Sequence, residues 1–265
     1  MKYVVVTGAF GGMGKSVCEY LTKEGYIVFA LDKRVEKVSN EKIIPIQVDI
    51  TSDESVMSAK EEVAKLTDTV FAVCHFAGIY DLNSFVEMDS GRLEQMFQIN
   101  VLGANRVNKA FLPLLKKGST IFLTTSELAP LDPLPFTGVY AVTKSALDKY
   151  AFSLRMEVQL LGINVVVLRP GAVQTNMLGD STRALDKFCN DTQLYKCNSK
   201  RFKEIVDSVE ARKISPEKIA QKTVKILGKK RKKFVYSINR NPLLLLLNAL
   251  PARLQTFIIR KILEK

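Results

Sequence analysis

Short apolar runs rich in β-branched residues alternate along this chain with stretches of helical periodicity, and this alternation constrains the fold most. Six such runs occur, at residues 2–7, 26–31, 43–48, 70–76, 120–125 and 163–168. Helical spacing lies between most of them, as at residues 56–66, 93–115 and 140–161. Strands that are apolar on both faces and separated by helices form a parallel sheet buried on both sides. The sequence therefore predicts an α/β fold with a doubly wound parallel sheet, whose ligands bind at the carboxyl ends of the strands.

Composition favours one globular domain. The 265 residues are 47% apolar and 25% charged, which suffices for a chain that folds alone, and no interdomain linker interrupts residues 1–265. The single histidine, His75, excludes a His-rich metal site and makes a Ser-His-Asp triad improbable, so we expect no metal. The four cysteines show no C-x-x-C spacing, and residues 1–10 lack the features of a signal peptide. These features predict a cytoplasmic protein with free thiols.

The net charge of +12 is confined to the end of the chain. Residues 213–265 hold 14 Lys and Arg against 2 acidic residues, whereas residues 1–212 are balanced. The basic run Lys229–Lys233 precedes Leu243–Leu247 and further apolar residues, a combination that favours a membrane surface over nucleic acid. Helices packed on the domain or on a second subunit are an equal alternative. The apolar run is too short to span a bilayer. We treat residues 229–265 as a basic, apolar C-terminal extension that contacts a membrane peripherally or a subunit.

A glycine-rich loop follows the first expected strand. Gly8, Gly12 and Gly14 lie between that strand and a helix predicted over residues 15–23. Glycines here permit a tight turn and a close approach of the helix N-terminus to a pyrophosphate. Gly14-Lys15-Ser16 also matches the end of an ATP-binding phosphate loop, but that loop requires a glycine where Ala9 stands. The loop therefore favours a dinucleotide over ATP.

Two acidic residues end the second and third expected strands. Asp32 is placed to accept hydrogen bonds from the adenine ribose and would repel a 2′-phosphate, which favours NAD. Lys33 and Arg34 follow at once and could instead hold that phosphate, so NADP stays an alternative. Asp49 is placed to reach the adenine amino group, and a turn or helix-capping role for it is nearly as well supported.

Tyr140 and Lys144 are four residues apart in a stretch with helical periodicity, so their side chains share one helix face. An ammonium beside the phenol is expected to lower the phenol pKa from about 10 toward working pH, which makes the tyrosine a general acid and base. Ser126 ends the fifth expected strand upstream. The order of glycine loop, serine, tyrosine and lysine makes this pattern specific.

From residue 2 to about residue 178 the chain resembles the short-chain dehydrogenase/reductase family, which has a Rossmann fold. Its segment at residues 176–212, together with the basic, leucine-rich C-terminus, is most similar to the hydroxysteroid and retinol dehydrogenase branch of that family. The family pattern maps onto Thr7, Gly8, Gly12, Gly14, Asn100, Ser126, Tyr140, Lys144, Pro170, Gly171 and Thr175. Met13, Asp32, Asp49, Ala77, Gly78 and Val173 complete the expected cofactor-binding set.

The resemblance implies a role for each catalytic residue. Tyr140 exchanges a proton with the substrate oxygen, Ser126 holds that oxygen, and Lys144 binds the nicotinamide ribose and lowers the tyrosine pKa. Asn100 connects Lys144 to solvent through a water, and residues 172–175 meet the nicotinamide carboxamide. The implied reaction is hydride transfer between NAD, or NADP, and a secondary alcohol or ketone.

Two departures from the family pattern stand out. Phe76 occupies the position of an asparagine whose amide helps to brace the sheet. The segment between Ser126 and Tyr140 is one residue longer than usual and rich in proline, so Thr125 or Glu127 could shift into the place of the serine.

Residues 176–212 are expected to form a helical lid over the substrate. Apolar residues among polar ones suit an apolar ligand, namely Met177, Leu178, Leu185, Phe188, Leu194, Tyr195 and Phe202. We expect a lipophilic substrate such as a hydroxysteroid or retinoid, with other lipid-like or acyl ketones as the alternative. A homodimer or homotetramer is expected, and no nucleic acid. A non-catalytic dinucleotide sensor on this fold is the alternative from another functional class, against which the intact Tyr140 and Lys144 argue.

Overall fold

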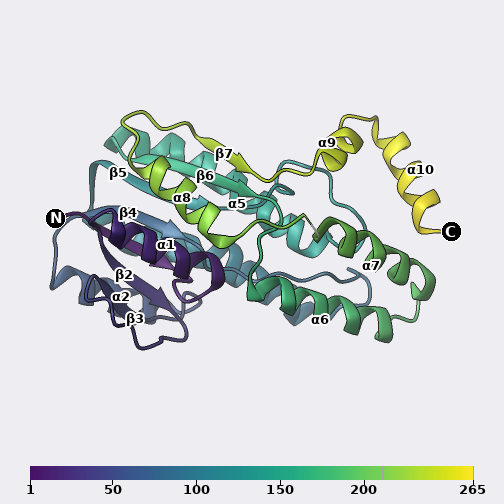
Figure 1. Ribbon diagram of the computed structural model, residues 1–265, viewed down its shortest axis with the longest axis horizontal. Helices are drawn as coiled ribbons and strands as arrows, with labels where there is room; N and C mark the ends of the chain where they lie inside the picture. The colour runs from purple at the N-terminus through teal and green to yellow at the C-terminus, as the bar shows by residue number, and fades with distance from the viewer. Residues whose placement is uncertain (211, 265) are drawn as a thin grey trace.

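Seven parallel strands form one sheet in the order β3-β2-β1-β4-β5-β6-β7, as the computed structural model shows (Figure 1). The structure describes residues 1–210 and 212–264, without the side chains of residues 176–181, 209 and 210. The strands are β1 (Tyr3–Thr7), β2 (Ile27–Asp32), β3 (Ile43–Gln47), β4 (Val70–His75), β5 (Leu115–Thr124), β6 (Asn164–Pro170) and β7 (Val235–Ile238). The strand order reverses beside β1, where β4 pairs on its other side, so a ligand cleft is expected at the ends of β1 and β4.

Helices cover both faces of the sheet because the central strands are apolar on both sides. On one face α1 (Gly12–Lys23) packs against α8 (Pro216–Leu227), and Leu21 and Ile219 are fully buried there. On the other face lie α2 (Asp53–Ala64), α4 (Gly103–Phe111) and α5 (Gly138–Val158). The expected doubly wound parallel sheet in a single domain is therefore confirmed.

Two features were not predicted. β7 adds a seventh, four-residue strand beside β6 at the edge of the sheet. The stretch expected as one helix over residues 93–115 is divided into α3 (Ser90–Phe97), a π-helix (Gln98–Leu102) and α4, and residue 115 already begins β5. Helical periodicity cannot separate these pieces, because a π-turn shifts the register by only one residue.

The segment expected as a lid forms two helices, α6 (Asn176–Asp191) and α7 (Lys196–Glu210). Their apolar side chains pack with Leu82, Phe136 and Leu263 in a third core, apart from the two cores on the sheet. Phe136 has a φ of +63°, unusual for a non-glycine residue, and its ring packs against those of Phe188 and Phe202. Met177, Leu178 and Ala211 of the expected lid lie outside the residues whose side chains are described.

The C-terminal extension is not one continuous element. The basic run Lys229–Lys233 forms the turn between α8 and β7, and β7 then runs along the edge of the sheet toward α9 (Pro242–Asn248) and α10 (Ala252–Leu263). The turn and α10 lie at opposite ends of the long axis of the molecule (Figure 1). The expectation that this run and the apolar helix present one surface is therefore wrong. In the described part of the chain, no helix has the length and apolarity needed to cross a membrane.

Candidate active site

The glycine loop between β1 and α1 is packed so tightly that side chains cannot be added to it. A Cβ at Gly14 would lie 2.0 Å from the carbonyl oxygen of Gly8, and one at Gly8 would lie 2.5 Å from the backbone nitrogen of Ala77. Gly8 also has a φ of +65°, which favours glycine. A Cβ at Gly12 would approach the Thr175 side chain to 2.7 Å. These glycines therefore place the loop against the end of β4 and the start of α6.

The loop opens onto a cleft that fits a dinucleotide. The cleft has a volume of about 1100 Å³ and runs from Asp32 and Asp49 past the glycine loop to Gly78 and Thr175. Among the described residues no side chain caps α1, and its first turn holds no acidic residue. The backbone N–H groups at the helix N-terminus are thus available to an anion such as pyrophosphate. The volume of the cleft, the compact glycine loop and the uncapped N-terminus of α1 each suit a dinucleotide. The residues present therefore fit NAD or NADP.

Asp32 is held at the end of β2 by the backbone around it. Its Oδ2 accepts a hydrogen bond from the Phe10 backbone N–H at 3.0 Å, and its Oδ1 accepts one from the Arg34 N–H at 3.2 Å. Asp32 also lines the cleft. Its carboxylate is therefore fixed between the glycine loop and the position expected for the adenine ribose.

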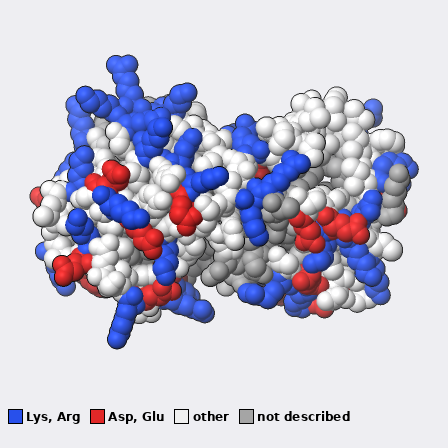
Figure 2. Space-filling view, in the orientation of Figure 1, with Lys and Arg blue, Asp and Glu red and all other residues white. Residues whose placement is uncertain are grey.

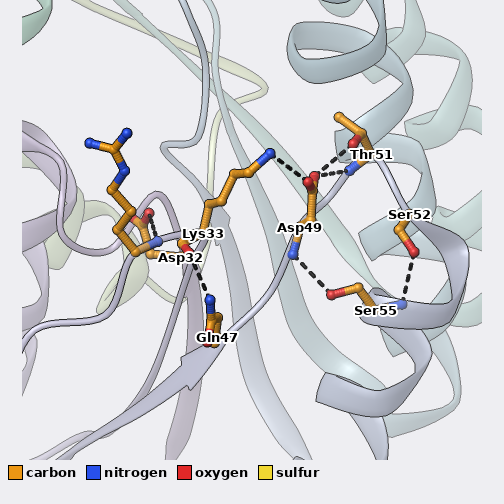
Figure 3. Close-up of polar contacts among 8 residues, drawn as sticks. Asp32, Lys33, Gln47, Asp49, Thr51, Ser52 and Ser55 are labelled. Carbon is orange, nitrogen blue, oxygen red and sulfur yellow. Dashed lines mark hydrogen bonds and ion pairs between the residues drawn. The ribbon is translucent and has the colours of Figure 1, made fainter.

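Asp49 has polar partners on both carboxylate oxygens (Figure 3). Oδ2 pairs with Lys33 Nζ at 2.7 Å, and Oδ1 accepts hydrogen bonds from the backbone and hydroxyl of Thr51. The hydrogen bond from Lys33, followed by those from Thr51, lowers the Asp49 pKa to about 2. This is the turn role weighed for Asp49 above. The contact also draws Lys33 toward Asp49 along the rim of the cleft.

Ser126, Tyr140 and Lys144 meet at one place in the fold. Ser126 follows β5 and hydrogen-bonds the Tyr140 phenol from α5. One turn further along α5, Lys144 Nζ lies 5.6 Å from the centre of the Tyr140 ring and donates to the Thr124 carbonyl at 3.2 Å. All three residues line one pocket. The structure thus brings together the three residues expected to be catalytic.

The expected lowering of the phenol pKa is not what this geometry produces. Burial, which disfavours the phenolate, raises the pKa of Tyr140, and the hydrogen bond from Ser126 offsets only part of that rise. Burial also lowers the pKa of Lys144 to about 8. The prediction was wrong because it counted the charge of the neighbouring ammonium and omitted the desolvation of both groups.

Asn100 lies in the π-helix and is 1% exposed. Its Oδ1 accepts the Ile79 N–H at 2.8 Å, and its Nδ2 donates to the Ile79 carbonyl and to Thr143 Oγ1. A Cβ on Gly78 would lie 3.2 Å from Asn100 Oδ1 and 3.4 Å from Lys144 Nζ. Asn100 therefore fixes the segment after β4 against α5, close to Lys144; its water-mediated role stays a prediction.

The alternatives to Ser126 point elsewhere. Thr125 Oγ1 hydrogen-bonds Asp148 and the Leu168 carbonyl, away from the phenol.

Phe76, at the position of the usual asparagine, is buried and stacks on Phe122 of β5 with ring centres 6.0 Å apart. This ring contact joins β4 to β5 at the place where the family uses an amide.

Glu127 was considered only as a substitute for the serine, yet it has a distinct place in the pocket. It is 7% exposed, lines the pocket, and its Oε2 accepts the Asn241 backbone N–H at 2.6 Å. Burial raises the Glu127 pKa. Asn241 caps α9 through its own side chain, so Glu127 ties the segment after Ser126 to the start of α9. The two residues are 114 positions apart in the sequence, so no local sequence pattern predicts this contact.

Tyr80 is a second residue that the sequence reasoning missed. Its ring meets that of Tyr140 edge-on, with centres 4.4 Å apart, and it lines both the cleft and the pocket. Its only signal is its position shortly after Ala77 and Gly78, which also line the cleft.

The turn after β6 forms the boundary between pocket and cleft. Pro170, Gly171 and Val173 line the pocket, Thr175 lines both cavities, and Met13 from the glycine loop does the same. A Cβ on Gly171 would lie 1.9 Å from the Asn239 carbonyl oxygen and 2.9 Å from Glu127 Oε1. Gly171 therefore lets the segment after β7 and Glu127 approach the turn. Thr7 Oγ1 is 3.5 Å from the Ala77 backbone nitrogen, which links β1 to this region.

The pocket beside Tyr140 is mainly apolar. It encloses about 190 Å³, and its far wall consists of Leu128, Leu134, Phe202, Ile205, Val206 and Leu244. Pockets for drug-sized ligands usually measure about 300–1,000 Å³. The pocket is therefore smaller in this structure than the pockets that usually hold ligands of that size, and α7 and α9 carry part of its wall.

His75 lies outside both cavities. It is 4% exposed in β4, and its Nε2 is 2.8 Å from Asn108 Oδ1 on α4. Burial lowers its pKa to about 4, so the ring is neutral near pH 7. His75 therefore has a structural role between β4 and α4.

The family model described as short chain dehydrogenase matches residues 2–186. The chain belongs to this family, whose members are oxidoreductases that bind NAD(H) or NADP(H). Over 212 residues it is 33% identical to mouse (Mus musculus) estradiol 17-beta-dehydrogenase 2, covering 72% of this chain and 55% of that protein. It is also similar to the NADPH-dependent 1-acyldihydroxyacetone phosphate reductase of Schizosaccharomyces pombe, with 28% identity over 69% of this chain and 65% of that one.

Solved structures share the fold. An alcohol dehydrogenase from Thermococcus sibiricus, complexed with 5-hydroxy-NADP, superposes with a TM-score of 0.74 at 23% identity, covering 91% of this chain and 99% of that one. The chain spans between about half and two thirds of the length of the curated relatives named above. The part matched by the family model, residues 2–186, contains the complete glycine loop and all of α5.

Proposed function

We propose that this protein interconverts a secondary alcohol and a ketone on a lipophilic substrate, such as a hydroxysteroid or retinoid, with NAD as the preferred cofactor. The observation that carries the proposal is the meeting of Ser126, Tyr140 and Lys144 in a mainly apolar pocket that adjoins a dinucleotide-sized cleft. Membership of an oxidoreductase family and the similarity to estradiol 17-beta-dehydrogenase 2 support it.

Each catalytic side chain has one task in this proposal. The dinucleotide, when bound, supplies or accepts the hydride. Tyr140 donates a proton to the carbonyl oxygen, and Ser126, already hydrogen-bonded to the phenol, holds the same oxygen. Lys144 presents its ammonium toward the cofactor ribose, and Asn100 keeps the neighbouring backbone in place. Pro170, Gly171, Val173 and Thr175 position the nicotinamide end.

The raised pKa of Tyr140 favours carbonyl reduction near neutral pH. A phenol that keeps its proton is ready to donate it to a ketone, whereas alcohol oxidation requires the phenolate as a base. We therefore expect reduction to be efficient at neutral pH and oxidation to gain rate as the pH rises.

NAD is favoured by the arrangement around Asp32. A carboxylate held by two backbone N–H groups at the ribose position disfavours a 2′-phosphate, and Lys33 is paired with Asp49. Arg34 is the residue through which NADP could still be accepted.

The proposal extends to substrate and assembly. The apolar wall formed by Leu134, Phe202 and Leu244 suits a lipid-like ketone, and the similarity to an acyldihydroxyacetone phosphate reductase keeps acyl ketones as the second substrate class. Exposed Phe152 and Met156 on α5 support a homodimer or homotetramer. Peripheral membrane contact through the C-terminal segment would bring a lipophilic substrate to the enzyme.

Turnover of a substrate panel tests the proposal. Purified protein is mixed with NADH or NADPH and with ketosteroids, retinal, an acyl ketone or a polar ketone, and reduced nicotinamide is followed by its absorbance. We expect NADH to be consumed with the lipophilic ketones. Consumption only with polar ketones contradicts the substrate class, and no turnover with any ketone or alcohol contradicts the activity.

A further inference from the structure

The outward side of α10 carries large apolar side chains among basic ones, although a helix on a protein surface usually turns its apolar side inward. Gln255 and Leu263 are buried against the protein. On the opposite side Leu254 and Phe257 are 43% and 57% exposed, and Ile262, closer to the buried side, is 43% exposed. Leu254 and Phe257 are three residues apart and so adjoin on one helix face, with Lys261 on the same face and Ile262 at its margin.

The preceding helix extends this apolar surface. Leu243 and Leu246 of α9 are 63% and 65% exposed, and α9 contacts α10. Figure 2 shows a mostly white surface at the upper right, over α9 and α10, with blue side chains at its margin. We call Leu243, Leu246, Leu254, Phe257 and Ile262 the C-terminal apolar face.

The charge around this face has one dominant sign. Residues 239–264 hold four basic residues and one acidic residue, and Arg253, Arg260 and Lys261 are exposed on α10 itself. Lys261 Nζ lies 6.0 Å from the ring centre of Phe257, so this basic side chain lies directly beside an exposed apolar one. A two-fold contact with a second copy would bring these basic residues close to their own copies. An anionic lipid surface complements both the exposed apolar side chains and the basic residues among them.

Helix α9 also forms part of the substrate pocket. Leu244, the neighbour of the exposed Leu243, lines the pocket. Glu127, which follows Ser126 in the chain, holds the start of α9 by its hydrogen bond from the Asn241 backbone. The exposed Leu243 and Leu246 are therefore on the same helix as Leu244, which lines the pocket that holds Ser126 and Tyr140.

We infer that α9 and α10 form an interfacial element that binds to an anionic phospholipid surface. This contact places the part of the substrate pocket wall that α9 forms next to the lipid. Delivery of substrate through α9 rests on the proposed function, whereas the lipid contact does not. The basic run at Lys229–Lys233, at the other end of the molecule, takes no part in this contact.

Vesicle sedimentation tests the contact without turnover. The full-length protein is mixed with phosphatidylcholine vesicles that contain or lack phosphatidylglycerol. We expect binding only to the anionic vesicles, and loss of that binding when salt rises from about 10 mM to about 1 M, because the Debye length falls from about 30 Å to about 3 Å. Phe257→Glu and Leu243→Glu should each weaken binding by about tenfold or more, since each removes an apolar side chain from the interface and adds a repelled charge.

Matched variants separate this surface from the alternatives. Leu160→Glu makes the same change at a leucine that is 84% exposed elsewhere, and Lys230→Ser with Arg231→Ser neutralises part of the basic run. Both should bind vesicles like the wild type, and circular dichroism melts should show that all variants fold. Absence of wild-type binding at low salt, equal loss in Leu160→Glu, or loss only in the Lys230 and Arg231 variant overturns the inference. So does dissociation of an oligomer by Phe257→Glu in place of lost binding. Ketone reduction in vesicle-free buffer, measured on the same preparations, reports the proposed function separately.

Discussion

The dinucleotide cleft and the substrate pocket share Gly78, Tyr80 and Thr175, yet the chain builds them in different ways. Most of the cleft comes from strand ends and from a glycine loop whose shape is set by backbone contacts. Much of the pocket comes from α7, α9 and the segment after Ser126, which meet through contacts between residues far apart in the sequence. Substitutions on the two sides should therefore fail in different ways, the cleft through cofactor binding and the pocket through substrate binding or chemistry.

The largest expected effect lies in the pocket. Tyr140→Phe removes the proposed proton donor and should lower turnover by about 10²–10⁴-fold, while dinucleotide affinity changes little because the cleft is untouched. Tyr150→Phe removes a hydroxyl from the same helix that bonds Asn108 outside both cavities, and it should keep turnover. Steady-state kinetics and cofactor titration measure both quantities. Full turnover in Tyr140→Phe would exclude the mechanism.

Lys144→Met should lower activity and raise the free energy of unfolding. Burial lowers the folded-state pKa of Lys144 to about 8, below its usual 10.5, so at pH 7 the folded protein carries a buried charge that costs free energy. Removing it should raise the free energy of unfolding at pH 7 by about 1–3 kcal/mol. The gain should shrink between pH 8 and about 10.4, where first the folded and then the unfolded lysine loses its proton.

Denaturant unfolding at several pH values measures this gain. Lys149→Met on the exposed side of α5 serves as the control and should change stability little. A Lys144→Met protein that is less stable at pH 7 would show that the contact with the Thr124 carbonyl outweighs the desolvation.

Glu127 offers a test of how the pocket wall is held. Glu127→Ala leaves the Asn241 N–H without its acceptor and should destabilise the protein by about 1–3 kcal/mol and raise KM for a lipophilic ketone. Glu127→Gln keeps an acceptor oxygen and should retain most of the stability. Thermal unfolding and KM measured together decide the point, since equal loss in both variants would assign the effect to the charge and not to the hydrogen bond.

Cofactor preference should show the smallest change. Asp32→Ser removes the carboxylate that we propose faces the ribose and should shift preference toward NADP by about tenfold, which corresponds to about 1.4 kcal/mol. Adding Asp49→Asn should release Lys33 from its pair and increase the shift. The ratio of kcat/KM values for NADH and NADPH measures it, and a wild type that already prefers NADPH would show that Arg34 dominates.

The contrast between the two regions also explains what could be predicted. The strands, the glycine loop and the pair Tyr140 and Lys144 follow from local periodicity and spacing, which fix which side chains share a face. β7 was not predicted because an edge strand of four residues shows little periodicity. The role of Glu127 was not predicted because its hydrogen-bond partner is 114 residues away in the sequence. The phenol pKa was misjudged because spacing along a helix contains no information about burial.

The late position of β7 has a consequence for synthesis of the chain. β6 ends at Pro170 and its partner β7 begins at Val235, so about 65 residues separate the two. At translation rates of about 5–20 residues per second, the ribosome needs roughly 3–13 s to make the intervening segment. During that time the hydrogen-bonding edge of β6, with buried Val166 and Val167, has no strand beside it on that side. Unpaired apolar edges favour aggregation. A chaperone would therefore protect the nascent chain most after Pro170 has been made and before β7 has been made.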